Sequence, residues 1–157
     1  GSGSTWTNTS DLTIGNYGDG ALNIINGGAV LSDIGYMGFA AGSTGKATID
    51  GNGSSWVNAG SLTIGGLGDA TLNISAGGLV SGGGSGVIIA EFAGSTGALN
   101  IGGAAGSAAL AAGALTAFAV DFGAGTGSLN FNHTDTAYDF TTPVTGDGTI
   151  NQIAGLT

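Results

Sequence analysis

The chain contains 157 residues, of which 35 are Gly, one is Pro and none is Cys, and 41% are apolar. This apolar content argues against a disordered coil, and the absence of a Gly-X-Y period excludes collagen. One Lys, no Arg and ten carboxylates give a formal net charge of −9, so we expect no binding to nucleic acid or to an anionic membrane surface.

The N-terminal stretch GSGSTWTN begins within a repeat and has neither the charged start nor the apolar core of a signal peptide, so we expect a fragment of a longer protein. The first apolar segments follow at 12–15, 22–25 and 29–31. Alternating apolar residues such as Leu12 and Ile14 belong on one face of a strand, with Thr13 on the other. Asn-Gly and Gly-Asp-Gly clusters turn the chain before a helix can form.

The segment 20–24 (GALNI) returns along the chain with a nearly constant period. Its copies lie at 45–49, 70–74, 97–101 and 127–131, in steps of 25, 25, 27 and 30 residues. A longer repeat of 50 residues is superimposed, because residues 10–31 and 60–81 are identical at 12 of 22 positions, and Trp6 and Trp56 share that offset. A short repeat with fixed period is typical of a solenoid, whose stacked units build one continuous core.

Short strands, tight turns and this period predict an all-β, right-handed parallel β-helix of roughly six coils, about 30 Å tall at the usual strand spacing. The chain is expected to form one β-helix segment, 1–157, with regular repeats at 1–101 and irregular coils at 102–157. Three groups of side chains are expected to point inward. The first is Leu22, Ile24, Ile49, Leu72, Ile74, Leu99, Ile101, Leu129 and Phe131; the second is Ile14, Ile34, Ile64 and Ile89; the third is Val30, Val57 and Val80.

Between the inward residues lies a polar row. It consists of Asn23, Thr48, Asn73, Asn100 and Asn130. We interpret this row as a structural ladder of side-chain hydrogen bonds, with a polar binding strip as the alternative. For Trp6 and Trp56 the alternatives are packing at a corner of the column or a stacking platform for a sugar, and we favour packing.

An uncharged run at 102–120 has the length of a membrane span. It consists mainly of Ala and Gly, so its apolar drive is weak and we expect no membrane insertion of this segment.

The paired segments GSTWTN…DLTIGNYGDGALNIINGGAV and GSSWVN…SLTIGGLGDATLNISAGGLV resemble the AIDA-like adhesin repeat in the passenger regions of type V secreted autotransporters of Gram-negative bacteria. The run FGAGTGSLNFNHTDTAYDFTTPVTGDGTINQIAGLT resembles the stretch where such passengers change repeat type. The resemblance implies a β-helix secreted or displayed at the surface of a Gram-negative outer membrane. It also implies adhesion or cell–cell self-association, with roles in biofilm formation and virulence.

Candidate chemical sites are sparse. Ser128, His133 and Asp135 are the residue types of a catalytic triad, but no G-x-S-x-G elbow accompanies them, and a polar turn explains them better. Asp19, Asp69 and Asp147 lie in Gly-rich turns without the calcium-binding nonapeptide, so turn formation explains them. We therefore expect no enzyme activity, no cofactor and no metal.

The function that we expect is an extracellular stalk or adhesive segment that acts through the side of the column. Its partner is either a second copy of the column or a host-surface receptor or glycan. Two alternatives stay open. One is a passive spacer for a domain outside this chain, and the other is a β-helical carbohydrate-active enzyme, which requires two carboxylates within about 10 Å in a groove.

Overall fold

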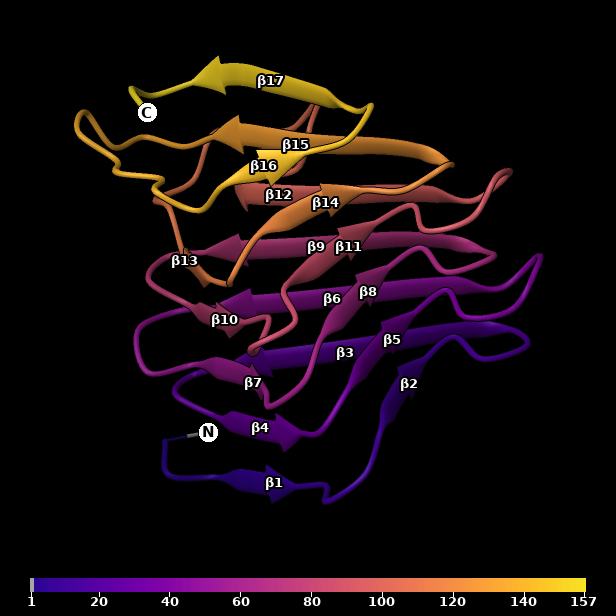
Figure 1. Cartoon of the computed structure of the whole chain (residues 1–157). Coiled ribbons are helices and arrows are strands. Elements are labelled where there is room, and N and C mark those ends of the chain that lie inside the picture. Colours follow the sequence, from indigo (N-terminus) through magenta and orange to yellow (C-terminus); the bar gives the residue numbers. More distant parts are fainter. Residues whose placement is uncertain (1) are drawn as a thin grey trace.

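The computed structural model describes residues 2–157 and is a parallel β-helix of about six coils. The chain visits three sheets in a fixed order, and each coil adds one strand to each sheet until the last coil, which adds strands to two of them. Figure 1 shows the coils stacked in chain order, with the two ends of the chain at opposite ends of the column. The predicted fold class is confirmed.

The strands of the three sheets pair in parallel throughout. Sheet A contains β1 (Thr5–Thr7), β4 (Ala29–Ser32), β7 (Ser55–Asn58), β10 (Leu79–Ser81) and β13 (Ala114–Thr116). Sheet B contains β2 (Leu12–Ile14), β5 (Gly35–Met37), β8 (Leu62–Ile64), β11 (Val87–Ile89), β14 (Val120–Phe122) and β16 (Val144–Thr145). Sheet C contains β3 (Asp19–Ile25), β6 (Thr44–Asp50), β9 (Asp69–Ser75), β12 (Thr96–Gly102), β15 (Thr126–Asn132) and β17 (Thr149–Ala154).

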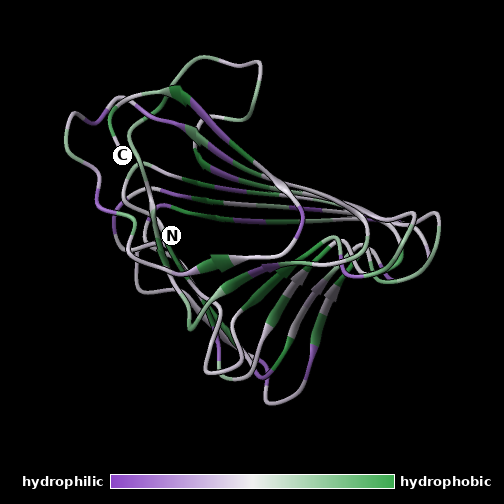
Figure 2. Cartoon of the chain, turned by 45° about the horizontal axis from the view of Figure 1, so that its top comes forward, coloured by the Kyte–Doolittle hydropathy of each residue, from purple (hydrophilic) through white to green (hydrophobic). Residues whose placement is uncertain are grey.

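Buried apolar side chains from all three sheets form one core cluster. Figure 2 shows that hydrophobic residues recur along the strands of these sheets. Alternation along each strand sends every second side chain inward, and identical register in successive coils stacks like residues on one another. The predicted core residues of sheet C lie in this interior, where Ile49, Leu72 and Ile101 are fully buried. Leu22, in the first coil, is only partly buried because it has a neighbouring coil on one side.

The turn between sheets B and C, which we call the B–C corner, depends on glycine. Gly15, Gly38 and Gly65 adopt φ values of +74°, +60° and +84°. A Cβ built on Gly15 would lie 2.2 Å from the carbonyl oxygen of Thr44 in the next coil. Glycine therefore supplies both the left-handed backbone and the close approach of neighbouring coils.

Two predicted inward positions are wrong. Met37, rather than Ile34, stands in register with Ile14 and Ile64, because the second coil forms its sheet B strand from Gly35–Met37. In sheet A, Trp56 aligns with the inward Val30, so Val57 faces solvent with 36% of its side chain exposed.

The part of the chain from 102 to 157 keeps the register of the column in β13, β14 and β15. Its departures are the long connections 103–113 and 133–143, together with a register shift between β15 and β17 at Phe131/Asn132. Aromatic side chains from the second connection cover the column, with the rings of Phe140 and Phe131 5.0 Å apart.

Candidate functional site

The row of Asn residues on the outer face of sheet C is a hydrogen-bonded ladder. The amide nitrogen of Asn100 donates to Oδ1 of Asn73 at 2.7 Å, and that of Asn130 donates to Oδ1 of Asn100 at 2.8 Å. Asn151, which the sequence analysis did not include, extends the ladder by donating to Asn130 at 2.8 Å. Asn100 and Asn130 are 2% exposed.

The first two members of the row differ from the rest. Asn23 and Thr48 align with Asn73 by strand register, and Asn23 is exposed while Thr48 is half-buried. In the middle of the column, amide groups bonded to one another are occupied and nearly inaccessible to a ligand. Among the amide groups of this row, that of Asn23 in the first coil is exposed, and those of Asn73 and Asn151 are half-buried.

A second outward row on sheet C is more accessible. It consists of Ala21, Lys46, Thr71, Ala98, Ser128 and Thr149. These side chains are small except for Lys46, and each is exposed or half-buried. They give sheet C an outer face that carries Thr or Ser in three coils, Ala in two and Lys in one.

The three aspartates singled out in the sequence lie along one edge of sheet C. Asp19 and Asp69 are two coils apart, with Thr44 between them in the register. Asp69 accepts a hydrogen bond from the hydroxyl of Thr96 at 2.7 Å. Asp147 lines a shallow polar hollow with Thr126 and Thr149. Among residues 2–157, no three His, Cys, Asp or Glu side chains are grouped so that they could hold a metal ion.

Another polar hollow, in the first coils, is lined by Asp19, Thr44 and Lys46. Each of these two hollows contains one carboxylate. A glycosidase site requires a pair, so neither hollow has the residues of one.

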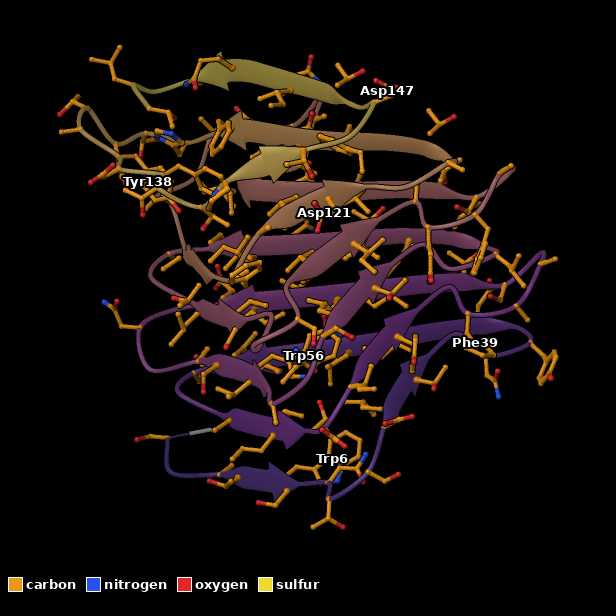
Figure 3. The ribbon with its side chains drawn as sticks, viewed as in Figure 1. Trp6, Phe39, Trp56, Asp121, Tyr138 and Asp147 are labelled. Carbon is orange, nitrogen blue, oxygen red and sulfur yellow. The ribbon has the colours of Figure 1, made fainter. Side chains whose placement is uncertain are left out.

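The two Trp residues occupy different environments (Figure 3). Trp56 is completely buried, and its indole nitrogen donates to Ser32 Oγ at 3.1 Å. Trp6 is 50% exposed and lines an apolar hollow of about 290 Å³ at the N-terminal end of the column with Leu22 and Ile24. Trp56 is therefore a core residue.

The structure does not bring Ser128, His133 and Asp135 together as a triad. His133 is fully buried, and its Nε2 lies 2.8 Å from the hydroxyl oxygen of Thr157. Its Nδ1 has no hydrogen-bond partner among the described residues. Neither ring nitrogen therefore contacts Ser128 or Asp135. Ser128 instead accepts a hydrogen bond from Asn130 at 3.3 Å.

Tyr138 closes the aromatic cover over the fifth coil. Its hydroxyl donates to the carbonyl oxygen of Gly113 at 2.9 Å, which joins the two long connections. Burial raises the pKa of Tyr138 to about 12, and the charge of Asp135 acts in the same direction, while a hydrogen bond from the Leu115 backbone acts against it. The side chain stays protonated at neutral pH and serves as a hydrogen-bond donor.

An exposed apolar row at the B–C corner was not identified from the sequence. It consists of Tyr17, Phe39, Leu67 and Phe92, which are 84%, 41%, 48% and 49% exposed, and we call it the corner row. Each of the first four coils contributes one member, and Figure 3 shows Phe39 at this edge of the column. The sequence did contain a signal for this row, because each of these four turns has one large apolar residue two or three positions after the end of its sheet B strand.

The run 102–120 forms strands and connections of the column. No helix within residues 2–157 has the length and apolar character needed to cross a membrane.

The chain is 36% identical over 145 residues to an uncharacterized lipoprotein, YdeK, of Escherichia coli K12. The match covers 90% of this chain and 11% of the relative, so the chain spans only about a ninth of that protein's length. No family model matches the sequence, and no solved structure matches it.

Proposed function

We propose that this chain is a stalk or adhesive segment of a Gram-negative cell-envelope protein, and that it acts through the side of the β-helix by adhesion or by self-association. The observation that carries the proposal is the outer face of sheet C, on which a small side chain (Ala, Ser or Thr) recurs in every coil except the one that carries Lys46. Such a face can lie against a second column over several coils, because most coils add similar contacts. The similarity to a lipoprotein supports a location in the cell envelope.

Electrostatics oppose the association of two such columns. Each carries a formal charge of −9, so like columns repel, and salt or removal of charge should strengthen their contact. Asp11, Asp33 and Asp139 are exposed and lie outside sheet C. Replacing all three with Asn reduces the charge from −9 to −6 and leaves the proposed contact face unchanged.

Analytical ultracentrifugation over a concentration series tests the proposal at low and high salt. We expect reversible association that strengthens with salt and in the triple Asp→Asn variant, and that stays at the wild-type level in the charge-preserving variant D11E/D33E/D139E. If all three proteins are monomers at every concentration and salt, self-association is refuted and the segment is a spacer or binds a different receptor.

A bulky substitution locates the face. Thr71 lies on the outer face of sheet C and Thr116 on sheet A. Thr71→Trp should weaken the association, because it separates the two faces, whereas Thr116→Trp should leave it unchanged. An equal effect of both substitutions would contradict the assignment to sheet C.

A further inference from the structure

The corner row has the form of a binding ridge. Exposed apolar side chains are common when scattered singly, but a contiguous set on one edge indicates an interaction site. Backbone hydrogen bonds between successive turns place the members at successive levels of the corner, with Phe39 set one residue off the other three and its ring packed edge-on against Tyr36, 5.2 Å between centroids. Phe39 N donates to Gly15 O at 2.9 Å, Leu67 N to Phe39 O at 3.1 Å, and Phe92 N to Gly66 O at 3.3 Å.

Carboxylates accompany the row. Asp19 and Asp69 each lie two positions after a row member, and Glu91 lies immediately before Phe92. Asp19 and Asp69 are exposed, and Glu91 is half-buried. The chain's only cation, Lys46, shares a hollow with Asp19 and Thr44, so the three carboxylates outnumber the cation beside the row. The surroundings of the row are therefore negative, which disfavours a second copy and favours a cationic partner.

The spacing of the row fits an α-helix. Successive coils are about 4.8 Å apart, so four members span about 14 Å. One turn of an α-helix rises about 5.4 Å, so the apolar stripe of an amphipathic helix offers one contact for each coil over about three turns. Alternate side chains of an extended peptide are about 6.7 Å apart and fall out of step with the coils.

We propose that the B–C corner binds a basic amphipathic α-helix, which lies along the column with its apolar stripe on the corner row and its Lys or Arg side chains beside Asp19, Asp69 and Glu91. The inference rests on the proposed adhesive function and names a surface and a partner for it. The corner row lies in the turns before sheet C, whereas Thr71 lies within strand β9 of that sheet, so substitutions at the row and at Thr71 test the two surfaces separately.

The probe is a synthetic helical peptide with Leu on one face and Lys on the other, labelled for fluorescence anisotropy, and its counterpart with Glu in place of Lys. The row variant is Y17S/L67S/F92S. Its matched control is L31T/V57T/L79T, which removes three exposed apolar side chains from sheet A and keeps the charge. Circular dichroism checks that both variants keep the β-fold.

We expect the wild-type column to bind the Lys peptide, to bind it more weakly as salt rises, and not to bind the Glu peptide. The row variant should bind about tenfold more weakly, which corresponds to about 1.4 kcal/mol, and the control within about twofold of wild type. The charge variant D19N/E91Q should bind more weakly at low salt and depend less on salt.

Equal binding by the row variant and its control would overturn the inference, because it would show attraction to negative charge alone. Absence of binding to the wild-type column at low salt would overturn it as well. Neither result bears on the ultracentrifugation test, in which the proposed self-association fails only if the columns remain monomeric.

Discussion

Coils 1 and 3 carry nearly the same sequence and place it in different surroundings. Both contain a Trp-x-Asn motif, at Trp6 and Asn8 and again at Trp56 and Asn58. Trp56 is buried and Trp6 is half exposed, because strand β7 has β4 and β10 on its two sides whereas β1 pairs only with β4. The burial of a residue in this column is therefore set by the neighbouring coils rather than by its own repeat.

The polar partners of the motif follow the same rule. In coil 3 the hydroxyl of Ser32 donates to Asn58 Oδ1 at 2.8 Å, and Asn58 Nδ2 donates to the carbonyl oxygen of Ser81 at 3.0 Å. These contacts link coils 2, 3 and 4 through buried side chains. In coil 1, Asn8 instead donates within its own turn to the carbonyl oxygen of Asp11 at 2.9 Å.

The largest expected effect comes from truncating the two Trp residues. Trp56→Ala leaves a cavity in the core and removes the indole donor to Ser32 Oγ, so it should lower the free energy of unfolding by about 3–5 kcal/mol. Trp6→Ala should cost about 1 kcal/mol, because half of that side chain already faces water. Urea denaturation followed by circular dichroism measures both. If the two variants lost similar amounts of unfolding free energy, the neighbouring coils would not determine how much each Trp contributes to stability.

A smaller contrast is expected in the Asn ladder. Asn100→Ala leaves Oδ1 of Asn73 without its donor and removes the closer of the two acceptors of the Asn130 amide, which should cost about 1–3 kcal/mol. Asn23→Ala, in the exposed first coil, should change stability by less than about 0.5 kcal/mol. The same urea experiment applies, and a large loss in N23A would mean that the ladder is closed in coil 1 as well.

The smallest effect concerns the far end of the column at alkaline pH. Tyr138 ionises near pH 12 in the folded chain and near 10 when unfolded, so folding favours its neutral form. Its contribution to stability is complete below pH 10 and is lost as pH rises from 10 through 12. Urea midpoints measured from pH 8 to 12 should fall more steeply in the wild-type chain than in Tyr138→Phe. Parallel curves would show that this tyrosine does not titrate with unfolding.

Much of the fold was predictable because alternation and period are local properties of the sequence. Ile14 and Ile64 alternate with Thr in identical segments, and both stack in the core as predicted. The prediction for Ile34 was wrong because the second coil has no Leu-Thr-Ile segment. Its sheet B strand is Gly35–Met37, in which Met37 takes the inward position. The prediction for Val57 was wrong because Trp56 and Val57 are both apolar. The sequence alone does not say which of the two faces inward, and the register with Val30 decides for Trp56.

The corner row was beyond this kind of reasoning. Its members lie in turns of different length, such as 15–18 and 38–43, so no fixed period connects Tyr17 to Phe39. Their alignment follows from hydrogen bonds between turns of successive coils, which depend on the stacked structure. Exposed residues in turns also have no alternation that would indicate the direction of their side chains.

The ladders between coils run along the axis of the column, whose two ends carry the two ends of the chain (Figure 1). Tension between those ends loads the outermost coil first, because that coil is held by a neighbour on one side only. Peeling off a coil of 25 residues lengthens the chain by about 80 Å, which is about 3.4 Å for each residue less the strand spacing. A column of this construction yields to force in nearly equal steps and absorbs mechanical work while the remaining coils stay folded.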